Sequence, residues 1–431
     1  MSFLLLLCGV LLLLLTGLPV FAGLALFGGA LLFVVQGDLG ALGEVVFGEL
    51  NRYLLVAIPL FALMAHIMIR GRLVDDLYHA AHTFTRHLPG GIGIATVAAC
   101  TLFAAVSGSS VATALTIGAV AIPQMIHYGY SPRMAYGLVA AGGTLGILIP
   151  PSSPMVLYGV VTETSIGALF MAGLLPGLMI AALFALWCLF DARRNGRLRV
   201  EPRADWHERM RAARRAVWVL GLPLLVLGGM YLGVFTATEA AGIGALAALL
   251  IAVVAYRPFG WRALWAAATD ASRTTAMLFM ILAGASVFGH VLAKLRVPQE
   301  VVALVTALDL GAGGFLLAAM LLILILGMFL DTIAIILVTT PVLLPVMAQL
   351  GIHPVWYGVL LMINLELALI TPPVGMNLFA IKGIDVDGIG RAPMGEIVRG
   401  VLPYVLLLAL ALLLVFAVPQ LALWLPGTRF G

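Results

Sequence analysis

The sequence predicts an all-α, polytopic membrane protein. Hydrophobic residues make up 63% of the 431 residues and charged residues only 10%, whereas soluble globular proteins carry roughly 25% charged residues. Apolar runs long enough to cross a bilayer as helices recur along the chain, and the period-two alternation of a membrane strand is absent from the sequence. The 48 glycines and 22 prolines predict broken helices, because membrane helices tolerate interruptions only where neighbouring groups satisfy the freed backbone.

The uncharged segments give the order of the expected elements. In the first half we expect two helices within 3–35, a helix at 53–69, an interfacial segment at 73–87, split runs at 87–132 and 134–162, and a helix at 166–190. In the second half we expect helices at 216–234 and 239–256, an interfacial segment at 258–270, a helix at 274–292, a run broken at Asp331 and Thr332, a Pro-interrupted helix at 354–380 and a final helix at 401–425.

A concentration of arginine predicts the orientation. Nine of the 23 Lys and Arg residues lie between Arg193 and Arg215, and basic loops stay in the cytoplasm. Counting helices outward from this loop places both termini on the periplasmic or extracellular side. Lys294 and Arg296 would then also lie outside, against the charge rule. We interpret the basic loop as an orientation signal and not as a nucleic-acid surface.

The chain repeats itself at an offset of 222 residues. The matched positions are Pro123 and Pro345, Gly129 and Gly351, Pro132 and Pro354, the pair Pro150, Pro151 and the pair Pro372, Pro373, and Ser109, Ser110 and Asp331, Thr332. An odd number of crossings separates equivalent points, so the second copy is expected to be inverted, as in many secondary transporters. The alternative is that membrane proteins reuse Gly and Pro freely. Re-entrant hairpins and full crossings satisfy the same parity, so the sequence leaves that choice open.

Four polar breaks interrupt these runs, at 107–110, 149–154, 330–332 and 370–377. Each break leaves carbonyl and amide groups without helical partners inside apolar sequence, where unsatisfied groups are costly. Carbonyl oxygens suit a cation such as sodium, and helix N-termini suit a carboxylate. One pair of breaks per repeat therefore predicts two related cation sites. The alternative is a kink satisfied by water or by a neighbouring hydroxyl group.

Several single polar residues could also take part in transport or could have a purely structural role. Asp331 is predicted to ligate a cation or carry a proton, and the alternative is a helix cap that binds amides near residue 334. For Glu366, whose repeat partner is Thr144, a buried hydrogen bond and proton transfer are equally favoured. Capping or a helix-dipole contact explains Glu163, Glu239, His66 and His290.

Several other classes of protein are disfavoured. Cys8, Cys100 and Cys188 show no paired spacing, so neither a disulfide framework nor a metal site is predicted, and no P-loop motif for ATP hydrolysis occurs. An intramembrane hydrolase using Ser109 or Ser110 would need a general base that no break supplies. A channel would show a continuous polar stripe. We therefore expect no enzyme activity and no cofactor apart from a coupling ion.

Five motifs carry a resemblance to a known family. They are AAVSGSSVATA at 104–114, GGTLGILIPPSSPMVLYG at 142–159, GMFLDT at 327–332, ITPPVGMNLF at 370–379 and, more weakly, AIPLF at 57–61. Over nearly its whole length the chain resembles the large membrane (M) subunit of tripartite ATP-independent periplasmic (TRAP) transporters. The resemblance implies the fold of the ion transporter superfamily, in the bacterial inner membrane, with inverted repeats, two re-entrant helical hairpins and two discontinuous helices that form the transport domain of an elevator and move against a scaffold.

That resemblance also implies a division of the chain. We expect N-terminal scaffold helices at 1–52, a first inverted repeat at 53–190 with a hairpin at about 89–130 and a broken helix at about 132–164, a cytoplasmic Arg-rich loop at 191–215, scaffold helices and an interfacial arm at 216–271, and a second inverted repeat at 272–431 with a hairpin at about 311–351 and a broken helix at about 354–380.

Site residues follow by position in the same motifs. The first sodium site would comprise Ser107, Ser109, Gly146, Ile149 and Pro151, largely through main-chain oxygens. The second sodium site would comprise Asp331, Ala368, Thr371 and Pro373. The substrate would lie near Ser110, Ser153, Thr332, Gly375 and Asn377. None of the four breaks contains Arg or Lys, so amides, hydroxyls, helix ends and bound sodium would have to recognise an anion.

The family implies a sodium-coupled import of an organic anion, such as a C4-dicarboxylate, a sialic acid or a related carboxylate. It also implies two separate partners in addition to the lipid bilayer, a soluble periplasmic substrate-binding protein (P-type) and a small four-helix membrane subunit (Q-type). The alternative within the same class is a stand-alone ion-coupled carboxylate carrier without a binding protein. No residue distinguishes between the substrates.

Overall fold

Helices form almost all of the described structure. The computed structural model describes residues 6, 9, 10, 12, 13, 16–71, 73–195, 200–256, 259–386 and 390–429. The helices are α2 (Val20–Gln36), α3 (Leu42–Leu50), the 3-10 helix η1 (Tyr53–Val56), α4 (Ala57–Arg70), α5 (Leu73–Thr85), α6 (Gly91–Ser107), α7 (Ser110–His127), α8 (Pro132–Thr144), the 3-10 helix η2 (Leu145–Ile147), α9 (Ser153–Thr162), α10 (Ile166–Asn195), α11 (Trp206–Tyr231), α12 (Ala237–Ala255), α13 (Trp261–Lys294), α14 (Val297–Ala307), α15 (Ala312–Gly327), α16 (Thr332–Gln349), α17 (Pro354–Leu369), α18 (Met376–Lys382), α19 (Met394–Ala417) and α20 (Gln420–Gly427). Strands β1 (Asp385–Val386) and β2 (Gly390–Arg391) pair antiparallel. Eight helical segments within the described residues are long and apolar enough to cross a membrane.

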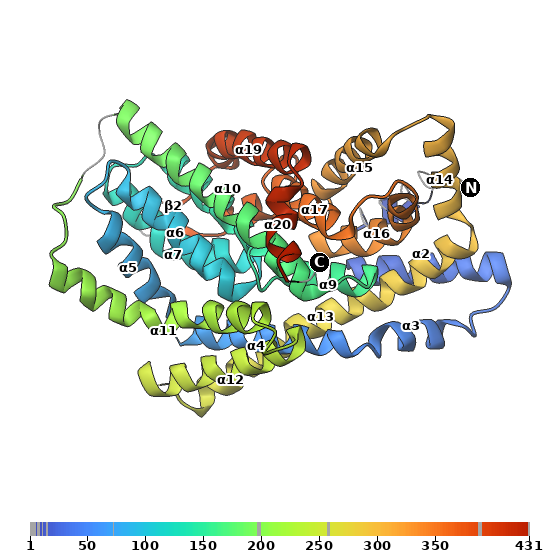
Figure 1. The fold of residues 1–431 in the computed structure, drawn as a ribbon, viewed down its shortest axis with the longest axis horizontal. Coiled ribbons are helices and arrows are strands. Elements are labelled where there is room, and N and C mark those ends of the chain that lie inside the picture. The colour runs from blue at the N-terminus through green and yellow to red at the C-terminus, as the bar shows by residue number, and fades with distance from the viewer. Residues whose placement is uncertain are drawn as a thin grey trace.

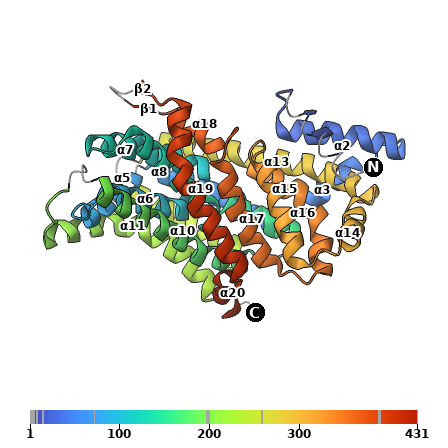
Figure 2. The ribbon, with the colours of Figure 1, turned by 90° about the horizontal axis from the view of Figure 1, so that it is seen from above.

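The helices form two layers (Figure 1). In the first, which we call the α13 layer, α13 packs against α2, α3 and α4, and α12 packs against α4 and α11. The second, which we call the α17 layer, contains α6 to α10 and α15 to α20. Helix α5 packs against α6 and α11, and α14 packs against α16 and α13, so both helices connect the layers. Figure 2 shows α19 crossing the α17 layer between α18 and α20.

The helix bounds follow the repeat seen in the sequence. Helices α6, α7, α8 and α9 begin at residues 91, 110, 132 and 153, and α15, α16, α17 and α18 begin at 312, 332, 354 and 376, each within one residue of the 222-residue offset. The peptide bonds Pro150–Pro151 and Pro372–Pro373, which match at this offset, are both cis. The two halves of the chain therefore share one order of helices and breaks.

Four helix predictions need correction. The predicted interfacial segment 258–270 and helix 274–292 form one continuous helix, α13. Asp270, between the two predicted segments, lies inside this helix and pairs with Arg70 of α4 at 2.5 Å. The final predicted helix, 401–425, is two helices, because α19 ends at Ala417 and α20 follows Pro419. Helices α3 and α14 were not predicted, and α10 and α11 extend into the predicted loop at 191–215. Residues 196–199 of that loop, and parts of the predicted N-terminal helices, lie outside the described residues.

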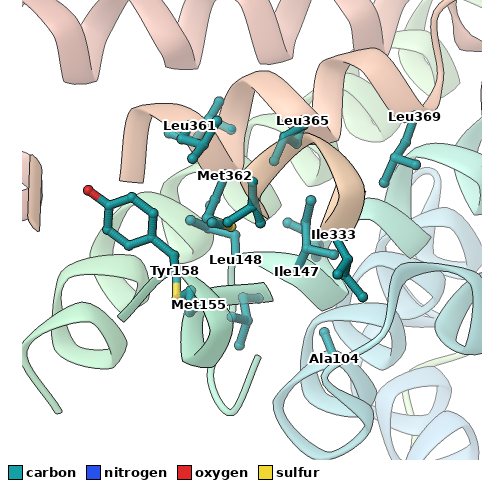
Figure 3. Close-up of a cluster of buried hydrophobic side chains, with 14 of the residues drawn as sticks. Ala104, Ile147, Leu148, Met155, Tyr158, Ile333, Leu361, Met362, Leu365 and Leu369 are labelled. Carbon is teal, nitrogen blue, oxygen red and sulfur yellow. The ribbon is translucent and has the colours of Figure 1, made fainter. Parts of the chain in front are cut away.

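The core of the α17 layer joins the two repeats. Figure 3 shows Leu361, Leu365 and Leu369 of α17 facing Leu148, next to η2, and Met155 of α9. All five side chains are buried, with at most 3% exposed. The breaks that follow η2 and α17 are therefore held from behind by closely packed apolar side chains.

A polar cluster fastens the segment that connects the two repeats. The guanidinium of Arg86, between α5 and α6, donates two hydrogen bonds to Glu208 of α11 at 2.5 and 2.8 Å. Glu201 lies 3.4 Å from Arg86, accepts a hydrogen bond from the Tyr128 hydroxyl after α7, and lies 3.9 Å from Nε2 of His82. The cluster thus ties the α5–α6 corner and the end of α7 to the connecting segment.

Candidate ion and substrate site

Each hairpin turns at a short break and restarts with a capped helix. Between α6 and α7 the chain turns at Gly108, whose φ is 59°, and the Ser109 side chain accepts a hydrogen bond from the amide of Ala112 at 3.4 Å. Between α15 and α16 the Asp331 carboxylate accepts from the amide of Ile333 at 3.1 Å. The helix cap, which was the alternative interpretation of Asp331, is therefore present. Ser109, which matches Asp331 at the repeat offset, forms the equivalent cap in the first repeat.

The predicted first sodium site is compact. A Cβ at Gly108 would lie 2.3 Å from the Pro151 carbonyl oxygen, and a Cβ at Gly146 would lie 2.5 Å from the Ser109 carbonyl oxygen. Only glycine leaves room for these approaches, because real Cβ contacts essentially never fall below 3.0 Å. The structure therefore brings the first hairpin tip against the break that follows η2.

The carbonyl groups at this tip differ in what they already bind. The Ser109 carbonyl accepts from both the amide and the hydroxyl of Thr113, at 3.1 and 2.8 Å, and Ser107 Oγ lies 2.8 Å from the Thr113 hydroxyl. By contrast, no group of the described residues donates a hydrogen bond to the carbonyls of Ile149 or Pro151. The first predicted site thus contains two carbonyl oxygens without a hydrogen-bond partner among the described residues. Thr113 is a further polar residue of this tip, which was not predicted from the sequence.

The predicted second sodium site is looser. A Cβ at Gly327, at the end of α15, would lie 2.5 Å from the Cβ of Ala368, so the second hairpin packs closely on the end of α17. Thr371 stays tied to α17, since its amide donates to the Ala368 carbonyl at 3.1 Å and its hydroxyl donates to the Leu367 carbonyl at 2.6 Å. Within the described part of the chain no hydrogen bond joins Asp331 to Ala368, Thr371 or the exposed Pro373.

The predicted substrate residues include one direct contact between the repeats. Ser110 Oγ donates to Asn377 Oδ1 at 3.0 Å, or accepts from Asn377 Nδ2 at 2.7 Å, and Asn377 Nδ2 also donates to the Ala140 carbonyl of α8 at 3.0 Å. Asn377 is 0% and Ser110 4% exposed. Two residues 267 positions apart thus meet at the start of α7 and the start of α18.

The other predicted substrate residues lie at helix starts. Thr332 is the buried first residue of α16, and Ser153 is the half-buried first residue of α9. The neighbouring Ser152 is the actual cap, because its hydroxyl donates to the Ile147 carbonyl at 2.6 Å and accepts from an amide of α9. Gly375 has a φ of 59° and donates its amide to the Met328 carbonyl at 3.4 Å, which links the break after α17 to the second hairpin.

Outside the breaks, two of the predicted polar residues lie at helix caps and one contacts a neighbouring helix. Glu239 and Thr236 form a reciprocal capping box at the start of α12, which confirms the predicted cap, and Glu163 is the C-terminal cap residue of α9. Nε2 of His66 lies 3.3 Å from the hydroxyl of Thr274. Glu366 differs, since it is 0% exposed and neither carboxyl oxygen has a hydrogen-bond partner among the described residues.

Comparison with known proteins identifies the family. The family described as "Tripartite ATP-independent periplasmic transporter, DctM component" matches residues 7–421. The chain is 39% identical to the C4-dicarboxylate TRAP transporter large permease protein DctM of Pseudomonas aeruginosa, over 89% of this chain and 88% of the relative. It is 35% identical to the ectoine TRAP transporter large permease protein TeaC of Halomonas elongata, over 97% of both chains.

A solved structure shares the fold at low sequence identity. The YdaH transporter of Alcanivorax borkumensis superposes with a TM-score of 0.65 at 15% identity, over 95% of this chain and 98% of that one. The fold, the repeated breaks and the family match agree over nearly the whole length. The chain therefore belongs to the DctM component, the large permease, of the tripartite ATP-independent periplasmic transporters.

Proposed function

We propose that this permease imports an organic anion across the bacterial inner membrane by sodium symport, with the α17 layer moving as the transport domain of an elevator against the α13 layer. The observation that carries the proposal is the meeting of the two repeats at Ser110 and Asn377, beside hairpin tips that end in capped helices. The free carbonyls of Ile149 and Pro151 supply oxygen ligands of the kind that cations bind at unwound helix ends. The start of α7 at Ser110 supplies amides suited to a carboxylate.

In this proposal the hairpins formed by α6 with α7 and by α15 with α16 are re-entrant. The first helix of each pair is short, since α6 has 17 residues and α15 has 16, whereas a full crossing takes about 20 residues. Each pair is joined by at most four residues. The short helices support tips that lie at membrane depth, where released carbonyls have no bulk water to bind.

The proposed partners are a periplasmic substrate-binding protein and a small membrane subunit. The two related permeases compared above are named for different substrates, a C4-dicarboxylate and ectoine. The family alone therefore does not select the ligand, and we expect the soluble partner to select it. A ligand screen on that partner, found by co-purification with the products of neighbouring reading frames, would name the substrate.

Uptake by proteoliposomes tests the proposal. Vesicles containing the permease, the small subunit and the loaded binding protein should show saturable uptake that requires an inward sodium gradient and is lost when potassium replaces sodium. Vesicles with a proton gradient and no sodium serve as the control. Sodium-independent uptake would contradict the coupling, and full uptake by the permease alone would favour the stand-alone carrier.

A further inference from the structure

Open space separates the two layers next to α9. A cavity of about 1000 Å³ lies between them, and its walls include Arg52, Val234 and Thr236 from the side of the α13 layer and Val160 and Ser165 from the α17 layer. A second cavity, of about 320 Å³, also has Arg52 in its wall. Since both cavities interrupt the apolar packing beside Arg52, direct bonds made by this residue contribute a larger share of the contact between the layers here.

Arg52 makes that bond. Its Nη1 donates a hydrogen bond to the Val160 carbonyl at 2.7 Å, and its Nη2 donates to the Glu49 carboxylate at 3.0 Å. Val160 lies in the last turn of α9, where carbonyls have no helical partner and a cation is favourable. Glu49 belongs to α3, which packs on α13. The guanidinium therefore connects the α13 layer to the carboxyl end of α9.

The larger cavity is poorly suited to an anion, although it contains Arg52. Its lining carries the carboxyl groups of Glu163 and Glu239, and Arg52 is already paired with Glu49. The Glu239 carboxylate accepts hydrogen bonds from the amide and the hydroxyl of Thr236, at 2.8 and 2.9 Å. An anion in this cavity would therefore face two carboxylates, Glu163 and Glu239, and only one cation, Arg52. The role of Arg52 is thus toward Val160 and not toward a ligand.

We propose that Arg52 is a positioning residue that holds α9, and with it the ion and substrate site, in the position seen in this structure. Helix α9 has 10 residues, so its ends lie about 15 Å apart. Its other end follows Pro151 and Ser152, which belong to the break at the first predicted sodium site. Movement of the α17 layer against the α13 layer requires the bond from Arg52 to Val160 to break. This inference rests on the elevator movement in the proposed function.

Distance measurement between spin labels tests the inference. Labels at Val234→Cys and Glu163→Cys lie on opposite walls of the larger cavity, and double electron–electron resonance on the purified full chain gives the ratio of displaced to held populations. Arg52→Gln should raise this ratio about tenfold. This factor is the lower end of the range for a charge-assisted hydrogen bond, chosen because the Arg52 side chain is 34% exposed and solvent weakens the bond. Arg52→Lys keeps the charge and one donor, so its ratio should fall between wild type and Arg52→Gln.

Arg70→Gln is the matched control, because Arg70 pairs with Asp270 within the α13 layer. It should leave the ratio unchanged. A residue that only stabilises the fold would lower the melting temperature without changing the ratio, and that result would overturn the inference. An equal ratio in wild type, Arg52→Gln and Arg52→Lys would overturn it as well. The measurement uses neither sodium nor substrate, so a failure of sodium coupling in vesicles would leave it unaffected.

Discussion

Asp331 caps α16 and, in the proposed function, also binds sodium. Its carboxylate accepts a hydrogen bond from the amide of Ile333 at 3.1 Å and interacts with the amides of Thr332 and Ala334. An amide side chain caps a helix about as well as a carboxylate. Asparagine at this position therefore keeps the cap and removes the charge, which separates the two roles experimentally.

We predict that Asp331→Asn retains wild-type melting but raises the sodium concentration for half-maximal uptake at least tenfold, because a neutral ligand attracts the cation less. Asp331→Ala should show the same loss and should also lose roughly 1 kcal/mol of stability with the cap. Sodium titrations of uptake and thermal melting of purified protein check both. Unchanged sodium dependence in Asp331→Asn would limit the residue to capping.

The bond between Ser110 and Asn377 allows a second prediction. Both side chains are buried, so removing either one leaves the other unsatisfied, which costs about 1 to 3 kcal/mol. We expect Ser110→Ala and Asn377→Ala to destabilise the protein separately and the double variant to lose less than the sum. A double-mutant cycle by thermal unfolding measures the coupling. Strict additivity would show that the contact contributes nothing.

At the scale of elements, charged side chains help to hold the connection between the repeats. Arg86 binds Glu208 and Glu201, while burial, the largest cause, lowers the pKa of His82 beside them. The charges of Arg86 and His79 act in the same direction, and Glu201 and Glu208 oppose them. His82 is consequently favoured in its neutral form in the folded chain.

A lowered pKa makes stability depend on pH in a defined direction. The neutral form of His82 supports the fold fully above the unfolded pKa of about 6.5, and this support is lost as the pH falls through the lower pKa of the folded state. We predict that the melting temperature falls less for His82→Gln, whose side chain cannot be protonated, than for wild type when the pH is lowered from 7 to 5. Thermal melts across that range provide the comparison, and parallel curves for the two proteins would contradict the prediction.

The sequence predicted the interruptions of helices better than their continuity. Gly108 and the paired prolines at 150–151 and 372–373 stop helices through local geometry, which sequence reveals directly. Within the continuous helix α13, Asp270 pairs with Arg70, 200 positions away in sequence, and no local pattern encodes that pair. The contact of Ser110 with Asn377 is equally distant, so the motif resemblance placed these residues in one site where spacing could not.

At the scale of the whole molecule, the two layers meet along α13 and α16, where the cavity of about 320 Å³ lies. Ser286 of α13 and Leu337 of α16 both line it. If the α17 layer moves during transport, a covalent link between these positions should stop the cycle. A link between two helices of the α13 layer should not.

We predict that a cross-link formed between Ser286→Cys and Leu337→Cys lowers the uptake rate more than tenfold and that reduction restores it. The control pair is Leu63→Cys with Ala271→Cys, on α4 and α13, which line a separate pocket. Uptake before and after reductant, in the same vesicles, provides the measurement. Full activity of the first cross-linked pair would exclude relative motion at this boundary.

The length of α13 has a consequence for the surrounding lipid. Its 34 residues extend about 51 Å, far beyond the roughly 30 Å of bilayer hydrocarbon. Trp261 and Trp265, near its first turn, are 72% and 65% exposed, as suits side chains that sit among headgroups. Such a helix either leans in the bilayer or extends into the headgroup region at its ends. Because α2, α3 and α4 pack on α13, we expect a change in its tilt, for example in bilayers of longer acyl chains, to shift these helices as well.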